Sequence, residues 1–325
     1  RTSEGWRDNS RYNIYTGYIS ANYQLTSKIN ISAEYTQADY KSQQPGGLTD
    51  VQFKANNRQS LRDRNWFGAP FNIASLTAKY EISKSITLQV KSFGTIAERI
   101  SVGFTKSITV KDTINPATLQ YNARQVDRDY YKNIGTEARI SVKYNFFGNQ
   151  NVFAGGLRAY RGITKREQLG TGTIGNNYDL SLTNPQYGRS LDLSTNNYAA
   201  FAENIFQIGK RLKVIPGFRF EYIENTIEGY INTSATGTLS PQKSILYGIG
   251  SEFKASKTTN VYANYSLSYR PVTFSELTPS GTTEIIDPNL KDASGFNADF
   301  GYRGTVKDFM NFDVGVFYLK YNNRI

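Results

Sequence analysis

The stretch Asn260-Val-Tyr-Ala-Asn-Tyr-Ser-Leu-Ser-Tyr-Arg270 alternates between two kinds of side chain. Its odd-numbered positions, from Val261 to Tyr269, are apolar or aromatic, whereas the even-numbered ones are polar apart from Tyr262. Successive side chains of a β-strand point to opposite faces, so this pattern predicts a strand with one apolar face and one wet face. Apolar residues at the helical spacing i, i+3 and i+4 are absent from it.

The same alternation recurs along the chain, for example in residues 74–82, 134–144 and 212–222. Consecutive strands of this kind are joined in pairs by very short polar segments, which have the size of hairpin turns. These turns are expected at residues 26–28, 83–85, 148–150, 209–211, 256–259 and 306–308.

Much longer polar segments separate one pair of strands from the next. Short and long connections therefore alternate, which is typical of outer-membrane β-barrels with tight periplasmic turns and long extracellular loops. The pattern predicts about twelve antiparallel strands of about 10 to 13 residues, long enough to cross a bilayer when tilted. A soluble β-sandwich has no need of five long loops at one end. The long segments are residues 41–72, 99–131, 165–196, 226–243 and 271–294.

The composition agrees with a membrane barrel and excludes several kinds of chemistry. The 325 residues include 24 Tyr, 19 Phe and 2 Trp but no His and no Cys. Without imidazole or thiol groups there is no Cys nucleophile, Ser-His pair, zinc site of the usual ligands or disulfide, so we expect neither an enzyme nor a resident cofactor. The mean hydropathy is −0.52, and no run approaches the roughly 18 to 20 apolar residues that a membrane helix needs. Membrane helices are therefore excluded, but barrels are not, because their strands average to a polar composition and their interfaces consume aromatic residues.

The two ends of the sequence predict a fragment. Arg1 opens directly into polar sequence without a signal peptide, and residues 318–325 end inside a strand pattern. An open sheet with an apolar face would leave unpaired backbone groups in lipid at several kcal/mol each. We therefore expect further strands that complete a larger barrel, rather than a barrel that closes on itself.

Two groups of motifs lie in order on the predicted strands and loops. The first comprises 45–53 (PGGLTDVQF), 58–62 (RQSLR) and 64–67 (RNWF). The second comprises 268–272 (SYRPV), 274–279 (FSELTP), 287–292 (DPNLKD) and 301–304 (GYRG). Together they resemble segments of TonB-dependent outer-membrane receptors of the ferric-dicitrate type, and the resemblance extends over essentially the whole chain.

This resemblance implies a barrel of about 22 strands with a plug domain inside it. It implies a monomeric receptor in the outer membrane of a Gram-negative bacterium, surrounded by lipid and lipopolysaccharide, that imports a ferric chelate with energy from the TonB-ExbB-ExbD complex. Residues 1–325 would be a partial barrel domain without the plug, the TonB box and the last strands. Three alternatives remain: a TonB-dependent importer of a glycan or peptide, a passive porin or structural barrel, and a secreted β-rich adhesin.

An iron chelate of the citrate type is an anion, and guanidinium groups bind carboxylates with two parallel hydrogen bonds. Basic residues at the extracellular ends of the strands are therefore candidate ligands. The alternatives for each are a solvated loop charge, an ion pair with Glu137 or Glu203 in the lumen, and a contact with lipopolysaccharide. The net charge of +11 is spread without a nucleic-acid-binding motif, so no nucleic acid is expected. The candidates are Arg124, Arg128, Arg158, Arg161, Arg166 and Arg270.

Overall fold

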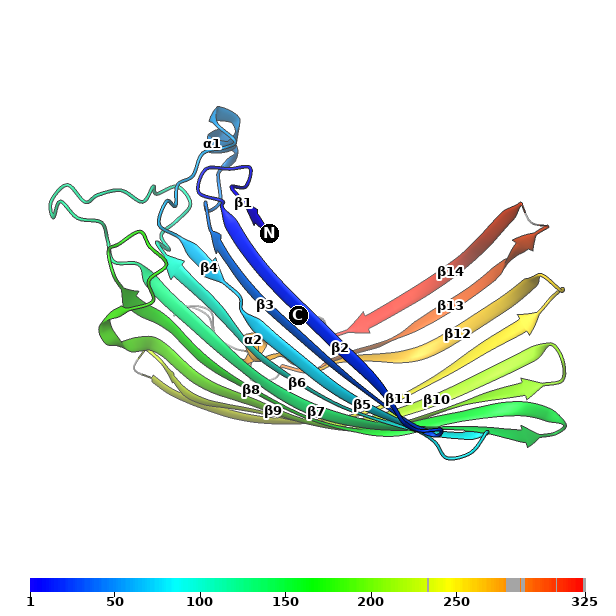
Figure 1. Cartoon of the computed structure of the whole chain (residues 1–325). Helices are drawn as coiled ribbons and strands as arrows, with labels where there is room; N and C mark the ends of the chain where they lie inside the picture. The colour runs from blue at the N-terminus through cyan, green and yellow to red at the C-terminus, as the bar shows by residue number, and fades with distance from the viewer. Residues whose placement is uncertain (233, 279–286, 288–289, 308, 324–325) are drawn as a thin grey trace.

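One antiparallel sheet of 14 strands makes up nearly all of the protein (Figure 1). The computed structural model describes residues 1–232, 234–278, 287, 290–307 and 309–323, and the side chains of all of these except residues 234–240. Neither helix of the described residues has the length and apolar character needed to span a membrane. The elements are β1 (Thr2–Ser3), β2 (Tyr12–Thr26), β3 (Ile29–Gln43), α1 (Asp50–Ala55), β4 (Trp66–Gly68), β5 (Phe71–Glu81), β6 (Ile86–Gly103), β7 (Gln125–Phe146), β8 (Asn149–Gly172), β9 (Leu182–Ile208), β10 (Leu212–Ile231), β11 (Ser234–Lys254), β12 (Thr259–Arg270), α2 (Phe274–Leu277), β13 (Ala293–Val306) and β14 (Met310–Asn322).

The number of long strands agrees with the prediction, but their lengths do not. β1 and β4 have 2 and 3 residues, which leaves twelve long strands of the 14. These twelve range from the 11 residues of β5 to the 27 residues of β9. The expected length of about 10 to 13 residues is therefore wrong for β6 to β11, which extend far beyond the thickness of a bilayer.

Two segments that the sequence analysis assigned to loops are mostly strand. Within 226–243, β10 and β11 stay paired as far as Ile231↔Ser234, and within 165–196, β8 continues to Gly172 and β9 begins at Leu182. Water covers both faces of a sheet that projects from the membrane, so polar side chains occupy both parities there. The alternation disappears while the backbone pairing continues, which is why these segments look like loops.

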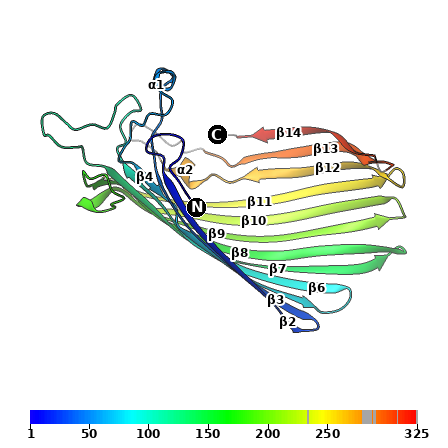
Figure 2. The same cartoon turned by 45° about the horizontal axis from the view of Figure 1, so that its top comes forward.

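The sheet is strongly curved and open, with β2 and β14 at opposite edges (Figures 1 and 2). Among the described residues no pairing joins these two strands. The expectation that the sheet does not close on itself is therefore confirmed for this part of the chain.

The two faces of the sheet differ as the alternation predicts. Large apolar side chains remain exposed on the convex face, among them Leu76 (54%), Leu157 (65%) and Ile245 (60%), as a lipid-facing surface requires. Aromatic residues of the same face pack across strands, for example Tyr198 against Tyr222 with ring centroids 6.5 Å apart. The polar parity faces the hollow of the sheet, where α2 also packs (Figure 2).

The connections at the two ends of the sheet differ in size. At one end the turns are tight, for example between Phe146 and Asn149, where Phe147 and Gly148 have φ angles of 48° and 71°. Two successive positive φ angles match a turn whose twist suits a hairpin. At the other end lie α1 and the long loops (Figure 1). Of the quoted motifs and turns, Pro279, Pro288, Asn289 and Asp308 lie outside the described residues.

Candidate functional site

A pocket of about 420 Å³ opens on the concave face, beneath the segment that follows β12. Arg158 and Tyr160 of β8, Asn197 of β9 and Asn225 of β10 line it, and residues 271–274 cover it. All four side chains project from neighbouring strands toward the hollow of the sheet, so they bring polar and aromatic groups into a pocket that apolar side chains also line. The remaining lining residues are Thr195, Glu221, Ile223, Leu246 and Tyr269.

Arg158 has no ion-pair partner among the described residues. Its guanidinium carbon lies 5.6 Å from the ring centroid of Phe93 and 5.8 Å from that of Tyr160. Its Nε is buried and makes no hydrogen bond. Glu137 is opposite Arg158 in the register, but the carboxylate of Glu137 accepts a hydrogen bond from Arg139. The positive charge of Arg158 is therefore left available to an anion in the pocket.

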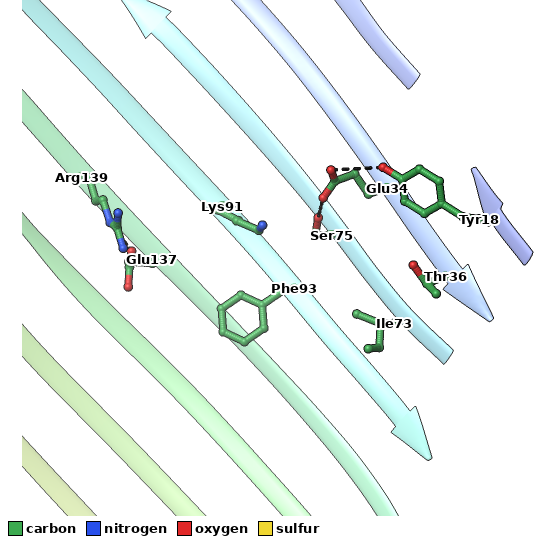
Figure 3. A pocket seen from close by; sticks show the side chains of 9 residues that line it. All are labelled: Tyr18, Glu34, Thr36, Ile73, Ser75, Lys91, Phe93, Glu137 and Arg139. Carbon is green, nitrogen blue, oxygen red and sulfur yellow. Dashed lines mark hydrogen bonds and ion pairs between the residues drawn. The ribbon is translucent and has the colours of Figure 1, made fainter. Parts of the chain in front are cut away.

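A second pocket, of about 430 Å³, lies on the same face and is drawn in Figure 3. Glu34 and Glu137 both line it, and the carboxylate of Glu34 accepts hydrogen bonds from Ser75 at 3.0 Å and from Tyr18 at 3.5 Å. Lys91 also lines this pocket and, like Arg158, has no ion-pair partner in the described part of the chain. Phe93 belongs to this pocket while Arg158 packs near its ring, so the two pockets are neighbours.

Glycines on adjacent strands create the room for the aromatic rings of the concave face. A Cβ atom on Gly135 would lie 2.6 Å from Cζ of Phe93, and one on Gly156 would lie 2.6 Å from Cζ of Phe201. The tip of each ring therefore lies over a glycine of the next strand. This position brings Phe93 near Arg158 and Phe201 to 5.6 Å from the guanidinium of Arg219.

Hydrogen bonds hold the segment above the first pocket in place. Tyr269 donates to Asp292 at 2.9 Å, and the same carboxylate accepts from the backbone N–H of Val272 at 2.9 Å. Arg270 pairs with Glu276 at 2.8 Å. The hydrogen bond from Arg270 lowers the pKa of the Glu276 carboxyl below its ordinary value. Arg270 thus acts within this segment and is not among the residues that line the pocket.

Helix α2 anchors the segment on the sheet through apolar contacts. Leu191 and Leu193 of β9 and Ile227 of β10 form a buried cluster, against which Phe274 and Leu277 of α2 pack. These apolar side chains occupy positions of the concave parity. They place the cover directly above the pocket of Arg158.

Arg166 also faces the hollow, but a buried carboxylate neutralises it. Its Nε lies 3.3 Å from Oδ1 of Asp129, and Nη1 of Arg99 lies 3.6 Å from Oδ2 of the same group. Gln168 donates to Asp129 at 2.9 Å, and Asp129 is 1% exposed. Asp129 thus holds β6, β7 and β8 together above the pocket, with Arg166 as a structural partner.

Arg124 lies in the loops and is 1% exposed. Its Nη1 donates to the carbonyl oxygens of Asn177 at 2.7 Å and Arg64 at 3.2 Å, and its Nη2 donates to the hydroxyl of Thr173 at 3.1 Å. Burial, together with the nearby charge of Arg64, lowers the pKa of Arg124. The guanidinium is thus occupied in joining three loop segments.

Two further arginines, which the sequence analysis did not select, also hold the loops together. Arg64 forms two hydrogen bonds of 2.7 and 2.8 Å with Asp112, and both side chains are almost completely buried. Arg62 donates to the backbone carbonyl oxygens of Val110 and Lys106, both at 2.6 Å. Both arginines lie in the quoted motifs 58–62 and 64–67. Their place in these motifs was the feature of the sequence that could have marked them as important.

Arg128 and Arg161 have the parity of the convex face. Arg128 pairs with Glu98 at 2.9 Å. Arg161 is exposed, opposite Ile134 in the register. The six predicted arginines are therefore not one cluster: Arg158 lines the pocket, Arg166 and Arg270 lie near it in ion pairs, and Arg124 belongs to the loops. The described residues contain no group of three or more acidic side chains that could hold a metal ion.

Comparison with known proteins agrees with this fold. The family model described as TonB dependent receptor-like, beta-barrel matches residues 5–325. The structure is similar to that of the ferric citrate transporter FecA in the unliganded form, with 20% identity, a TM-score of 0.81 and coverage of 98% of this chain and 44% of that one.

Two other solved structures match nearly as well. FpvA of P. aeruginosa, in complex with a heterologous pyoverdine and iron, has 13% identity and a TM-score of 0.75, with 99% of this chain and 43% of that chain covered. The ferric-catecholate import receptor Fiu from E. coli K12 has 11% identity and a TM-score of 0.74, with 98% and 52% covered. The chain thus spans about half the length of the structures it matches, and at these identities the similarity concerns the fold.

Proposed function

Because the chain belongs to the TonB dependent receptor-like β-barrel family, we propose that it forms part of the barrel of an outer-membrane receptor that imports a ferric chelate. The cargo is ferric dicitrate or another anionic siderophore complex. Residues 1–325 supply barrel wall and extracellular loops, and parts of the protein outside this chain supply the plug and the contact with TonB-ExbB-ExbD. The receptor acts as a monomeric barrel in lipid and lipopolysaccharide of a Gram-negative outer membrane.

The observation that carries the proposal is the unpaired guanidinium of Arg158. Most charged groups around it have a partner: Arg139 pairs with Glu137, and Arg219 with Glu221. Leaving Arg158 unpaired beside a partly closed pocket costs desolvation energy, which an anionic ligand offsets. Two tyrosines and two asparagines in the same pocket suit the hydroxyl and carbonyl oxygens of a chelate.

Family membership favours a TonB-coupled receptor over a passive porin and over a secreted adhesin. A glycan importer remains the second candidate, because Tyr160, Tyr269, Asn197 and Asn225 are also side chains that bind sugars. A neutral glycan has no use for the charge of Arg158. Replacing Arg158 by an uncharged residue should therefore weaken binding of an anionic chelate but not binding of a neutral glycan.

The test uses the full-length receptor with Arg158→Ala, and Arg161→Ala on the opposite face as the matched control. Binding of ferric citrate and of other single chelates is titrated on the purified protein, and growth is followed with each chelate as the only iron source. Loss of a charge-assisted contact of about 1.5–3 kcal/mol predicts at least about tenfold weaker binding for Arg158→Ala. Arg161→Ala should bind like the parent.

Unchanged chelate affinity in an assembled Arg158→Ala barrel would overturn the role of Arg158. Growth of a strain without the receptor gene on every chelate, at the rate of the parent, would overturn the substrate class.

A further inference from the structure

One row of the concave face places a single carboxylate between two cations. In the register, Lys91 of β6 is directly opposite Glu137 of β7, and Glu137 is directly opposite Arg158 of β8. Neighbouring strands lie about 4.8 Å apart, so the backbones at Lys91 and Arg158 are separated by about 10 Å. Opposite charges that face each other across neighbouring strands attract. Glu137 is therefore placed to neutralise either cation.

Glu137 nevertheless pairs with neither of them. Its carboxylate accepts a hydrogen bond from Nε of Arg139, two residues along the same strand. Figure 3 shows these two side chains directed toward each other and the ammonium group of Lys91 directed away from Glu137. Within the part of the chain that the structure describes, Lys91 and Arg158 are left without an ion pair.

The other carboxylates near this row are also engaged. Glu34 lines the same pocket as Lys91 and accepts hydrogen bonds from two hydroxyl groups. Glu221 lines the pocket of Arg158 and accepts a hydrogen bond from Arg219 at 3.0 Å. Both cations of the row are therefore left for an anion from outside the wall, with which charge-assisted hydrogen bonds are strong.

We propose that Arg139 is a positioning residue of the chelate site. It holds Glu137 away from Lys91 and Arg158, so that these two cations bind two carboxylate groups of one ligand. The inference rests on the proposed function and narrows its cargo to chelates with several carboxylates, because an ammonium and a guanidinium group at this separation match two anionic groups. Without Arg139, Glu137 turns to one of the cations and competes with the ligand as an internal anion.

The experiment titrates ferric citrate on the purified full-length receptor, with barrel assembly checked by heat-modifiable migration. Arg139→Gln should weaken the affinity about tenfold, the effect of losing one charge-assisted contact. Adding Glu137→Gln to this variant should restore the parent affinity, a rescue that a merely structural ion pair would not give. Lys91→Gln should weaken the affinity by a similar factor. The matched control is Arg303→Gln, which breaks another ion pair, with Glu252, and should bind like the parent.

The outcomes separate this inference from the proposed function. A loss in Arg139→Gln that Glu137→Gln does not reverse would overturn the positioning role. An equal loss in Lys91→Gln for a chelate without carboxylates would overturn the ligand class. If Arg158→Ala weakens chelate binding while Arg139→Gln and Lys91→Gln bind like the parent, this inference fails and the proposed function stands. A parent receptor that binds no anionic chelate would overturn the proposed function itself.

Discussion

At the scale of single residues, the distribution of ion pairs decides which charges remain for a ligand. Arg158 and Arg166 are both on the concave face of β8. Arg166 forms an ion pair with Asp129, whereas Glu137, which is opposite Arg158, accepts a hydrogen bond from Arg139 instead. One arginine thus joins strands, and the other lines a pocket. A substitution that displaces the ring of Phe93, which lies beside Arg158, should therefore alter chelate binding without removing a charge.

Gly135→Ala tests that support. The added Cβ would lie 2.6 Å from Cζ of Phe93, so the ring must move from its place beside Arg158. We expect a several-fold weaker chelate affinity, with the assembled barrel retained. Gly17→Ala is the matched control because a Cβ at Gly17 meets nothing within 4 Å. Equal affinities of the two variants in a binding titration would show that Phe93 does not position Arg158.

Glu276 makes the cover of the pocket sensitive to acid. Its pKa is lowered from an ordinary value of 4.5, chiefly by the hydrogen bond from Arg270. A group with a depressed pKa in the folded state stabilises above its ordinary pKa, and this stabilisation is lost as pH falls through the depressed value. We expect residues 271–278 to open as the pH falls below the ordinary Glu276 pKa of 4.5 and through the depressed one, seen as faster amide exchange after correction for the intrinsic rate.

Glu276→Gln should abolish this pH dependence. The variant should exchange rapidly in residues 271–278 at pH 7 as well, because the charge-assisted bond is gone at every pH. An acid transition of the same size in both proteins would assign the opening to another group.

At the scale of elements, the strands continue beyond the membrane and the loops above them have their own polar core. β9 has 27 residues, and the loops at its upper end are joined through the buried side chains of Arg62, Arg64 and Arg124. Their partners are mostly backbone carbonyl oxygens, which a folded loop otherwise leaves without donors. Tyr178 takes part in this core: burial raises its pKa to about 12, and Lys41 lies 4.2 Å from its ring centroid.

Asp112→Asn should loosen this loop core. It leaves Arg64 as a buried charge without a counter-ion, at a cost of about 3–5 kcal/mol. We expect faster cleavage of residues 105–123 by an added protease, with unchanged heat-modifiable migration of the barrel in gel electrophoresis. Asp63→Asn, at an exposed neighbour of Arg64, is the control. Identical cleavage rates in the two variants would mean that the ion pair does not hold the loops.

At the scale of the whole molecule, one curved sheet separates a lipid-facing surface from a polar hollow. Leu76 is 54% exposed on the convex face, whereas Thr77 follows it on the concave parity. The two faces therefore demand opposite chemistry of adjacent residues. The stability of the full barrel should depend on which face receives a charge.

Leu76→Arg and Thr77→Arg form a matched pair for this asymmetry. A charge on the lipid face costs about 2–4 kcal/mol near the bilayer midplane, whereas a lumen residue is solvated. We expect a lower yield of assembled full-length receptor in outer membranes for Leu76→Arg only. An equal yield of the two variants would contradict the assignment of the convex face to lipid.

Alternation was sufficient to predict the all-β class, the number of long strands and the faces of residues such as Arg158 and Leu76, because side-chain direction along a strand has a fixed period of two. Alternation did not predict the upper parts of β8 to β11 as strand. Water covers both faces of the sheet there, so polar residues are tolerated at every position and the alternation is lost. Strand length there depends on pairing between segments far apart in sequence.

The sequence by itself determined an antiparallel membrane sheet with a wet face, and the residue type suited to an anion. The tertiary structure alone decided which arginine is free. Whether Arg124, Arg166 or Arg158 has a partner depends on the register that places Asp129 beside Arg166 and on the loop packing that encloses Arg124. Register and loop contacts join distant segments, and no local pattern specifies them.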